Sequence, residues 1–252
     1  MPGKIFGTVM SHGLKGRMLT KNELQMLTES RDMDELVTRM KNTVYLDALA
    51  KLTKPYTADK IENALKEYLV NTHTKMVNVS GGARILSAYF VKHITWNLKM
   101  ILKGKALGKS YDELLPKINL RAEELVGRRD LVVKALVSKN LDEAVSSIAG
   151  SEFAEDVTKA AAIYKDKGDV RIFDVYLDHV FYYDLGRAMN TESQSLEAKN
   201  IVSVDIDSYN VLAILRGKFW NLPPDEINNL VVATTSKVTK ETVQKMINTE
   251  KI

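Results

Sequence analysis

Cysteine is absent from the 252 residues, and proline occurs only five times. Without cysteine the chain has no disulfide, no thiolate metal ligand and no cysteine nucleophile, which suits a reducing cytoplasm. No apolar run approaches the roughly 18 residues that a membrane span requires. The opening residues also lack the apolar stretch of a signal peptide. We therefore expect any role at a membrane to be peripheral.

The formal net charge of +4 hides an uneven distribution of charge. Residues 1–118 hold 19 Lys and Arg against 11 Asp and Glu, whereas residues 119–252 hold 17 against 21. A basic half can face an acidic protein, lipid headgroups or nucleic acid, and an unevenly charged solvated surface gives the same counts. The basic residues are scattered, and no nucleic-acid-binding motif accompanies them.

Signals for β-strands are sparse, whereas helix-start signals recur along the chain. Each pairs a side chain that can accept a first-turn N–H with an acid three residues later. The pairs are Thr20 with Glu23, Asp32 with Glu35, Ser110 with Glu113 and Asn140 with Glu143. Thr57 and Pro223–Pro224 mark two further starts. Together with an apolar stripe at helical spacing from Ile85 to Leu102, these signals predict an all-α fold.

Comparison of the chain with itself reveals a repeat of about 110 residues. The segments 97–113 and 210–226 align without a gap at an offset of 113. Their matched pairs include Asn97 with Asn210, Lys103 with Arg216, Gly104 with Gly217, and Lys105 with Lys218. Residues 33–37 match 141–145 at an offset of 108, and 239–244 resemble 20–25.

This repetition predicts two helical repeat domains, 1–118 and 119–232, and the start of a third at 233–252. Chained domains related by similar rotations form curved or ring-like bodies with a concave side. Such a shape suits holding another protein.

The stretch from Gly104 to Ser110 superficially resembles a phosphate-binding loop. It has three residues between its glycines where that loop needs four, and it follows an apolar helix rather than a strand. We interpret it as a helix end, at which Gly104 or Gly108 adopts a left-handed conformation.

The four histidines lack zinc-ligand spacing, and His93 lies on the apolar stripe as a core or interface residue. We predict no catalytic residue, no cofactor and no metal site.

Asn97 and Asn210 are polar residues at matching places among apolar helical neighbours. A buried amide needs hydrogen-bond partners, so we expect both asparagines to tie neighbouring helices together. With Gly104 and Gly217 they form the signature of the repeat. The basic side chains of this signature either meet acidic groups on a partner protein or form a solvated face. They are Lys103, Lys105, Arg216 and Lys218.

The second copy of the repeat resembles a known family. Residues 207–218 read D-S-Y-N-V-L-A-I-L-R-G-K and are followed by L-P-P-D-E-I at 222–227. This resembles the ending of a domain in the C subunit of archaeal A-type ATP synthases, and the related d subunit (AC39) of V-type ATPases has the same plan. Residues 96–108 and the opening stretch 13–20 fit the pattern too, so the resemblance covers essentially the whole chain.

The resemblance implies three similar helical domains around a pseudo-threefold axis, which form a funnel. That funnel sits at the cytoplasmic face of the membrane, on the proteolipid ring, and holds the shaft subunits of the central stalk. It couples ATP synthesis or ATP-driven ion transport without an active site or nucleotide of its own. The implied partners are the shaft and the ring, not nucleic acid or a small-molecule substrate.

This sequence departs from the family at its end, where the third domain should only be starting. We expect most of that domain to be missing, through truncation rather than natural shortening. The alternative function is a helical repeat scaffold in another complex, and a third is a basic helical protein that binds nucleic acid. The sequence indicates neither the coupling ion nor the direction of the reaction, nor which surface meets which partner.

Overall fold

The computed structural model describes residues 2–191, 196–233 and 238–249. Every regular element within these ranges is a helix, so the prediction of an all-α fold is confirmed. The elements are α1 (Pro2–Lys15), α2 (Lys21–Thr28), α3 (Met33–Lys41), α4 (Leu46–Leu49), α5 (Ala58–Val79), α6 (Arg84–Ala88), α7 (Val91–Ala106), α8 (Tyr111–Leu114), the 3₁₀ helix η1 (Leu115–Lys117), α9 (Arg121–Val126), α10 (Arg129–Val137), α11 (Leu141–Ser147), α12 (Ala154–Lys167), α13 (Ile172–Thr191), α14 (Leu196–Phe219), α15 (Pro224–Asn229) and α16 (Lys240–Asn248).

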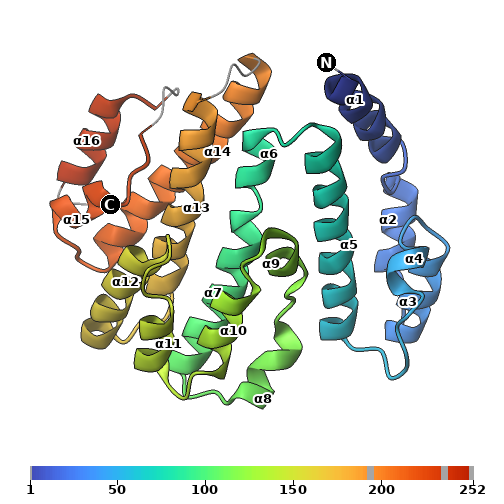
Figure 1. Ribbon diagram of the computed structural model, residues 1–252, viewed down its shortest axis with the longest axis horizontal. Coiled ribbons are helices and arrows are strands. Elements are labelled where there is room, and N and C mark those ends of the chain that lie inside the picture. The colour runs from blue at the N-terminus through green and yellow to red at the C-terminus, as the bar shows by residue number, and fades with distance from the viewer. Residues whose placement is uncertain (1, 192–195, 234–237, 250–252) are drawn as a thin grey trace.

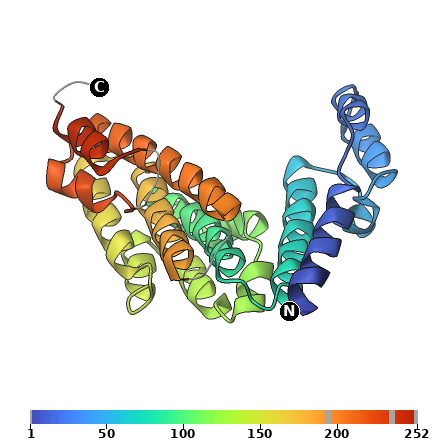
Figure 2. The ribbon, with the colours of Figure 1, turned by 90° about the horizontal axis from the view of Figure 1, so that it is seen from above.

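The helices follow one another along an arc. Helices α1 to α4 stand at one end and α15 and α16 at the other, with α5, α7, α13 and α14 between them (Figure 1). The view from above shows the N-terminal helices set at an angle to the rest (Figure 2).

The main hydrophobic core extends from Ile85 to Ile247. Within this core α7 packs against α13, and Leu98 of α7 and Leu177 of α13 are fully buried. A smaller cluster around Val37 joins α3 and α4 to α5. The main core crosses residue 118, which is the boundary between the predicted domains 1–118 and 119–232, and that division stays a prediction.

The helix starts expected from the sequence are confirmed. Thr20 and Glu23 form a reciprocal capping box, in which the N–H of Thr20 donates to Glu23 Oε2 at 2.7 Å. Asp32, Thr57, Ser110 and Asn140 each accept the N–H of the residue three positions later. These side chains satisfy amide donors that the first turn of a helix cannot pair internally.

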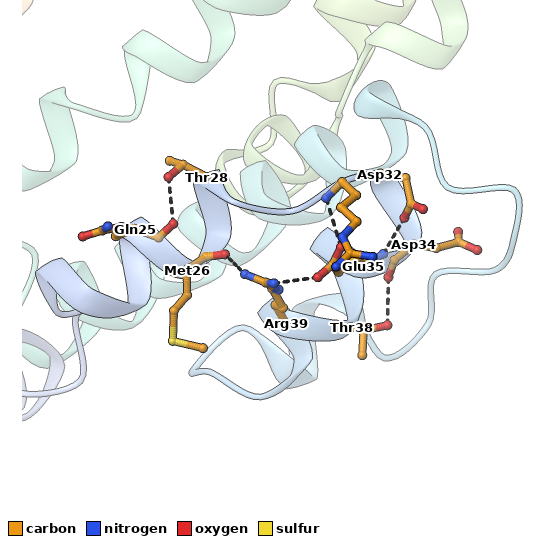
Figure 3. Close-up of polar contacts among 9 residues, drawn as sticks. Gln25, Met26, Thr28, Asp32, Asp34, Glu35, Thr38 and Arg39 are labelled. Carbon is orange, nitrogen blue, oxygen red and sulfur yellow. Dashed lines mark hydrogen bonds and ion pairs between the residues drawn. The ribbon is translucent and has the colours of Figure 1, made fainter.

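Arg39 joins α2 to α3 at the N-terminal end of the arc (Figure 3). Its guanidinium donates to the carbonyl oxygen of Met26 and, at 2.6 Å, to Glu35 Oε1. Glu35 also accepts the N–H of Arg31, and these bonds together hold the pKa of the Glu35 carboxyl below its usual value. The side chains of Arg39 and Glu35 are 28% and 29% exposed, so we expect this partly buried junction to orient α2 on α3.

The apolar stripe from Ile85 to Leu102 spans two helices rather than one, because α6 ends and α7 begins around Tyr89 and Phe90. The ring of Phe90 stacks on His73 of α5, with 4.2 Å between the ring centroids. The hydroxyl of Tyr89 donates to Asp205 of α14 at 3.0 Å. The two residues at the interruption therefore contact helices on different sides.

Candidate functional site

Asn97 and Asn210 are 7% and 3% exposed and make the same contact in two parts of the chain. Nδ2 of Asn97 donates to the carbonyl of Asn119 at 2.7 Å, and Oδ1 accepts the N–H of Asn119 at 3.4 Å. Asn210 forms the same pair of bonds with Val232, both at 2.9 Å. Each partner lies 22 residues after its asparagine. Each amide therefore fastens the segment after α8 or α15 back onto the preceding long helix.

Gly104 and Gly217 allow the short helices to approach the long ones. A Cβ atom at Gly104 would lie 2.3 Å from Cδ2 of Leu114, and one at Gly217 would lie 2.8 Å from Cγ1 of Ile227. Leu114 and Ile227 are both buried and both occur ten residues after their glycine. Glycine is thus the residue that fits where α8 packs on α7 and where α15 packs on α14.

Both long helices end through a left-handed residue, Gly108 with φ 71° and Asn221 with φ 54°. The N–H of Lys109 donates to the carbonyl of Gly104 at 2.9 Å, and that of Leu222 donates to the carbonyl of Gly217 at 2.9 Å. This is the hydrogen-bond pattern of a glycine-type helix C-cap. The stretch that resembles a phosphate-binding loop is such a cap, in which Gly108 rather than Gly104 takes the left-handed conformation.

Replacing Gly104 by alanine is expected to destabilise the protein by about 1–2 kcal/mol. Overpacking a filled core costs about 1–3 kcal/mol, and the helix propensity of alanine offsets up to about 1 kcal/mol of that cost. The matched control is Gly13→Ala in α1, where a Cβ meets nothing within 4 Å. Urea unfolding measures both variants. If Gly104→Ala is as stable as Gly13→Ala, the close approach of α8 does not matter.

The four basic residues of the signature lie in different surroundings. Lys103 pairs with Asp174 at 2.8 Å, Lys105 is only 6% exposed, and Lys218 donates to the carbonyl of Ile247 at 2.9 Å. Arg216 is exposed. Contact of these residues with another protein stays a prediction, and Arg216 is the one that an incoming protein reaches most directly.

The neighbouring histidines lie between α5 and α7. His93 Nε2 is 3.4 Å from His73 Nδ1, and His73 Nε2 is 2.7 Å from the carbonyl oxygen of Leu86. Because a carbonyl only accepts, His73 donates through Nε2 and accepts from His93. Burial lowers the pKa of both rings, and the charges of His73 and Lys92 help to bring that of His93 to about 4. Both rings are therefore neutral packing groups at pH 7.

Glu123 of α9 is a buried acid that the sequence did not single out. It is fully buried, and its Oε1 accepts Nδ2 of Asn97 at 2.7 Å. Its Oε2 is buried without a hydrogen-bond partner. Burial raises the pKa of this carboxyl to about 7, although the bond from Asn97 opposes the shift. In the sequence its only sign is the pair Glu123–Glu124 beside an apolar segment.

Metal-ligand clusters and membrane-spanning helices are both absent from the described ranges. No group of three His, Asp or Glu side chains in residues 2–191, 196–233 and 238–249 is arranged to hold a metal ion. Within the same ranges, no helix has the length and apolarity needed to cross a membrane.

The fold is all-α, and two of its long helices, α7 and α14, carry the same pair of contacts, one made by an asparagine (Asn97, Asn210) and one at a glycine (Gly104, Gly217). The chain belongs to the ATP synthase (C/AC39) subunit family, whose family model matches residues 8–252.

Three relatives illustrate this membership, each the C subunit of an A-type ATP synthase. That of Methanocaldococcus jannaschii is 30% identical over 221 residues, which cover 84% of this chain and 54% of the relative. That of Archaeoglobus fulgidus is 26% identical over 237 residues, covering 92% and 66%. That of Pyrococcus horikoshii is 24% identical over 246 residues, covering 95% and 62%. The chain thus spans between about half and two thirds of the length of these relatives.

Proposed function

We propose that this chain is a non-catalytic coupling subunit of an A-type rotary ATPase. In this role it is a socket between the shaft subunits of the central stalk and the proteolipid ring, at the cytoplasmic face of the membrane. The observation that carries the proposal is the family match over residues 8–252, together with relatives named as the C subunits of A-type ATP synthases.

The repetition within the structure supports this role. The Asn97 and Asn210 contacts use the same donor and acceptor atoms at the same spacing along the chain. This likeness supports the proposal of two tandem domains built on one plan. Domains chained in this way form a curved body with a concave side, which suits a socket.

A coupling subunit must also be stiff, because torque is lost in any part that yields. Helix α7 comes from the first proposed domain, yet its Ile101 and Leu102 are buried in one core with Phe173 of α13. Lys99 of α7 also pairs with Asp178 of α13, and Lys103 of α7 pairs with Asp174 of α13 at 2.8 Å. The two proposed domains therefore share a packed seam rather than a flexible linker.

Affinity capture from detergent-solubilised membranes of an archaeon with an A-type ATP synthase tests the proposal. We expect the tagged chain to recover shaft and proteolipid subunits, identified by mass spectrometry. The positive control is the full-length relative from Methanocaldococcus jannaschii, and the negative control is an unrelated helical protein of similar charge. Recovery of neither partner by a folded chain, when the full-length relative recovers both, would contradict the proposal.

The same capture separates the alternatives. Enrichment of a different protein complex favours a helical scaffold, and enrichment of nucleic acid that resists high salt favours a nucleic-acid-binding protein.

A further inference from the structure

The hydrophobic contacts divide the chain into two units that meet at α5. Helices α3, α4 and α5 share a small core around Val37, whereas the main core begins only at Ile85 and continues to Ile247. We call α1 to α5, residues 2–79, the arm, and the described residues from 84 onward the body. Figure 2 shows that the helices of the arm stand at an angle to those of the body.

The buried apolar contact between arm and body is small. It consists of Val70 of α5, Phe90 at the start of α7 and Ala122 of α9, with Val77 packed against them. Of the helices in the arm, α5 makes the main contacts across the boundary, with α6, α9 and η1. Because so few apolar side chains are buried there, separation of the arm from the body is opposed only weakly by the hydrophobic effect.

Several of the remaining contacts across this boundary are polar. Nδ2 of Asn63 donates to the carbonyl of Pro116 at 2.7 Å, and Nε of Arg121 donates to Oδ1 of Asn71 at 2.9 Å. When the boundary opens, water can take the place of either partner in such bonds. These bonds therefore favour one position of the arm without making other positions costly.

The covalent link between arm and body passes through two glycines. Gly81 and Gly82 have φ values of 75° and 78°, and a Cβ atom at either position would meet nothing within 4 Å. The N–H of Gly82 donates back to the carbonyl of Val77 in α5 at 2.9 Å, so the turn lies at the end of that helix. Glycine adopts φ of either sign at little cost, so rotation at these two residues can reorient α5 against α6.

The body is held together by a larger core. Helices α7 and α13 pack together within it, and Leu98 and Leu177 are fully buried. Ion pairs of Lys99 and Lys103 with α13 add to this contact. Rotation at the two glycines therefore moves the arm as a unit against a body that stays fixed.

We propose that the arm is a clamp that pivots on Gly81 and Gly82, with the contacts of α5 on α6, α9 and η1 as its latch. The pivot changes the angle between arm and body, so a protein seated in that angle selects the arm position that fits it. The stiff contact of α7 with α13 lies wholly within the body. The pivot belongs to the chain alone, so its failure and the failure of the coupling role proposed above are separate results.

Distances between pairs of nitroxide spin labels, measured by pulsed electron paramagnetic resonance, test the pivot. The chain has no cysteine, so each label is attached at one introduced cysteine. The pair that crosses the boundary is Asn22→Cys on α2 and Ser208→Cys on α14, and both positions are exposed. We expect its distance distribution to be about twice as wide as those of pairs within one unit, or wider.

Two control pairs use exposed positions on helices of the same unit. Asn22→Cys with Glu67→Cys lies within the arm, and Lys134→Cys with Ser208→Cys lies within the body. Both should give narrow distributions, because close-packed helices do not shift freely. A crossing pair as narrow as these controls would overturn the pivot. An arm pair as wide as the crossing pair would overturn it too, because the arm would then not move as a unit.

Weakening of the latch should open the arm further. Asn63→Ala combined with Arg121→Ala removes the bonds to Pro116 and Asn71. We expect the longer distances of the crossing pair to gain population about threefold to tenfold, because each lost bond favours the open arm. The control Asn229→Ala, at an exposed position of α15 in the body, should leave the distribution unchanged. An unchanged distribution in the double variant, with its fold confirmed by circular dichroism, would overturn the latch.

Discussion

The variant Asn210→Ala is expected to unfold with a free energy about 2–4 kcal/mol lower than that of the parent chain. The change removes both bonds to Val232, which is itself only 3% exposed. The N–H and the carbonyl of Val232 are then left without these partners in a buried place, and each such group costs about 1–3 kcal/mol. The end of the segment after α15 also loses its attachment to α14. Its release would expose apolar surface of the main core.

Thermal and urea unfolding measure this effect. For a chain of this size, 1 kcal/mol corresponds to roughly 2–4 °C, so the melting temperature should fall by about 5–15 °C. The matched control is Asn200→Ala, an exposed position on the same helix α14. That change should be neutral or slightly stabilising, because alanine is the better helix former. If the two variants are equally stable, the amide of Asn210 does not hold the segment in place.

The helix starts could be predicted from the sequence because they depend on neighbours in the chain. Thr20 and Glu23, or Asn140 and Glu143, are three residues apart, and the geometry of one helical turn brings them together. The C-cap at Gly108 could be predicted for the same reason. The resemblance between the two helix ends likewise needed only an alignment of the chain with itself.

The remaining features depend on contacts between segments distant in the chain. Glu123 is buried because α9 packs against α5 and α7, and its pair with Asn97 joins residues 26 positions apart. The division into arm and body depends on which helices share a core, so it too needed the structure. Periodicity alone also could not separate α6 from α7, because the apolar stripe continues across Tyr89 and Phe90. Residue patterns report which face of a helix is apolar, but not which helix covers it.

The protonation of Glu123 is expected to have the second large effect on the free energy of unfolding, and this effect depends on pH. Its pKa is about 7 in the folded chain and about 4.5 when it is solvated. Because the folded state holds the proton more tightly, the contribution of this group to stability is present below about pH 4.5 and is lost as the pH rises through 7. The difference between the two pKa values corresponds to a loss of about 3 kcal/mol in the free energy of unfolding by about pH 8.

The variant Glu123→Gln is therefore expected to be more stable than the parent at about pH 8, by about 1–3 kcal/mol. The amide keeps an oxygen that accepts from Asn97 but carries no charge, so the cost of burying a carboxylate disappears. At about pH 4.5 the parent carries a neutral acid at this position, and the gap between the two proteins should close. Urea unfolding at half-unit intervals across this range of pH measures the gap.

The variant must be compared with the parent at each pH, because the protonation of His93 changes the free energy of unfolding with pH in the direction opposite to that of Glu123. Its pKa is about 4 in the folded chain, against 6.5 when solvated, so it favours the folded state above pH 6.5 and ceases to do so as the pH falls toward 4. That effect is common to both proteins and cancels in the difference. The matched control is Glu124→Gln, which changes the neighbouring acid whose side chain is 46% exposed. A gap that stays constant with pH, or that appears equally in Glu124→Gln, would mean that Glu123 is solvated and that its link to Asn97 does not join α9 to α7.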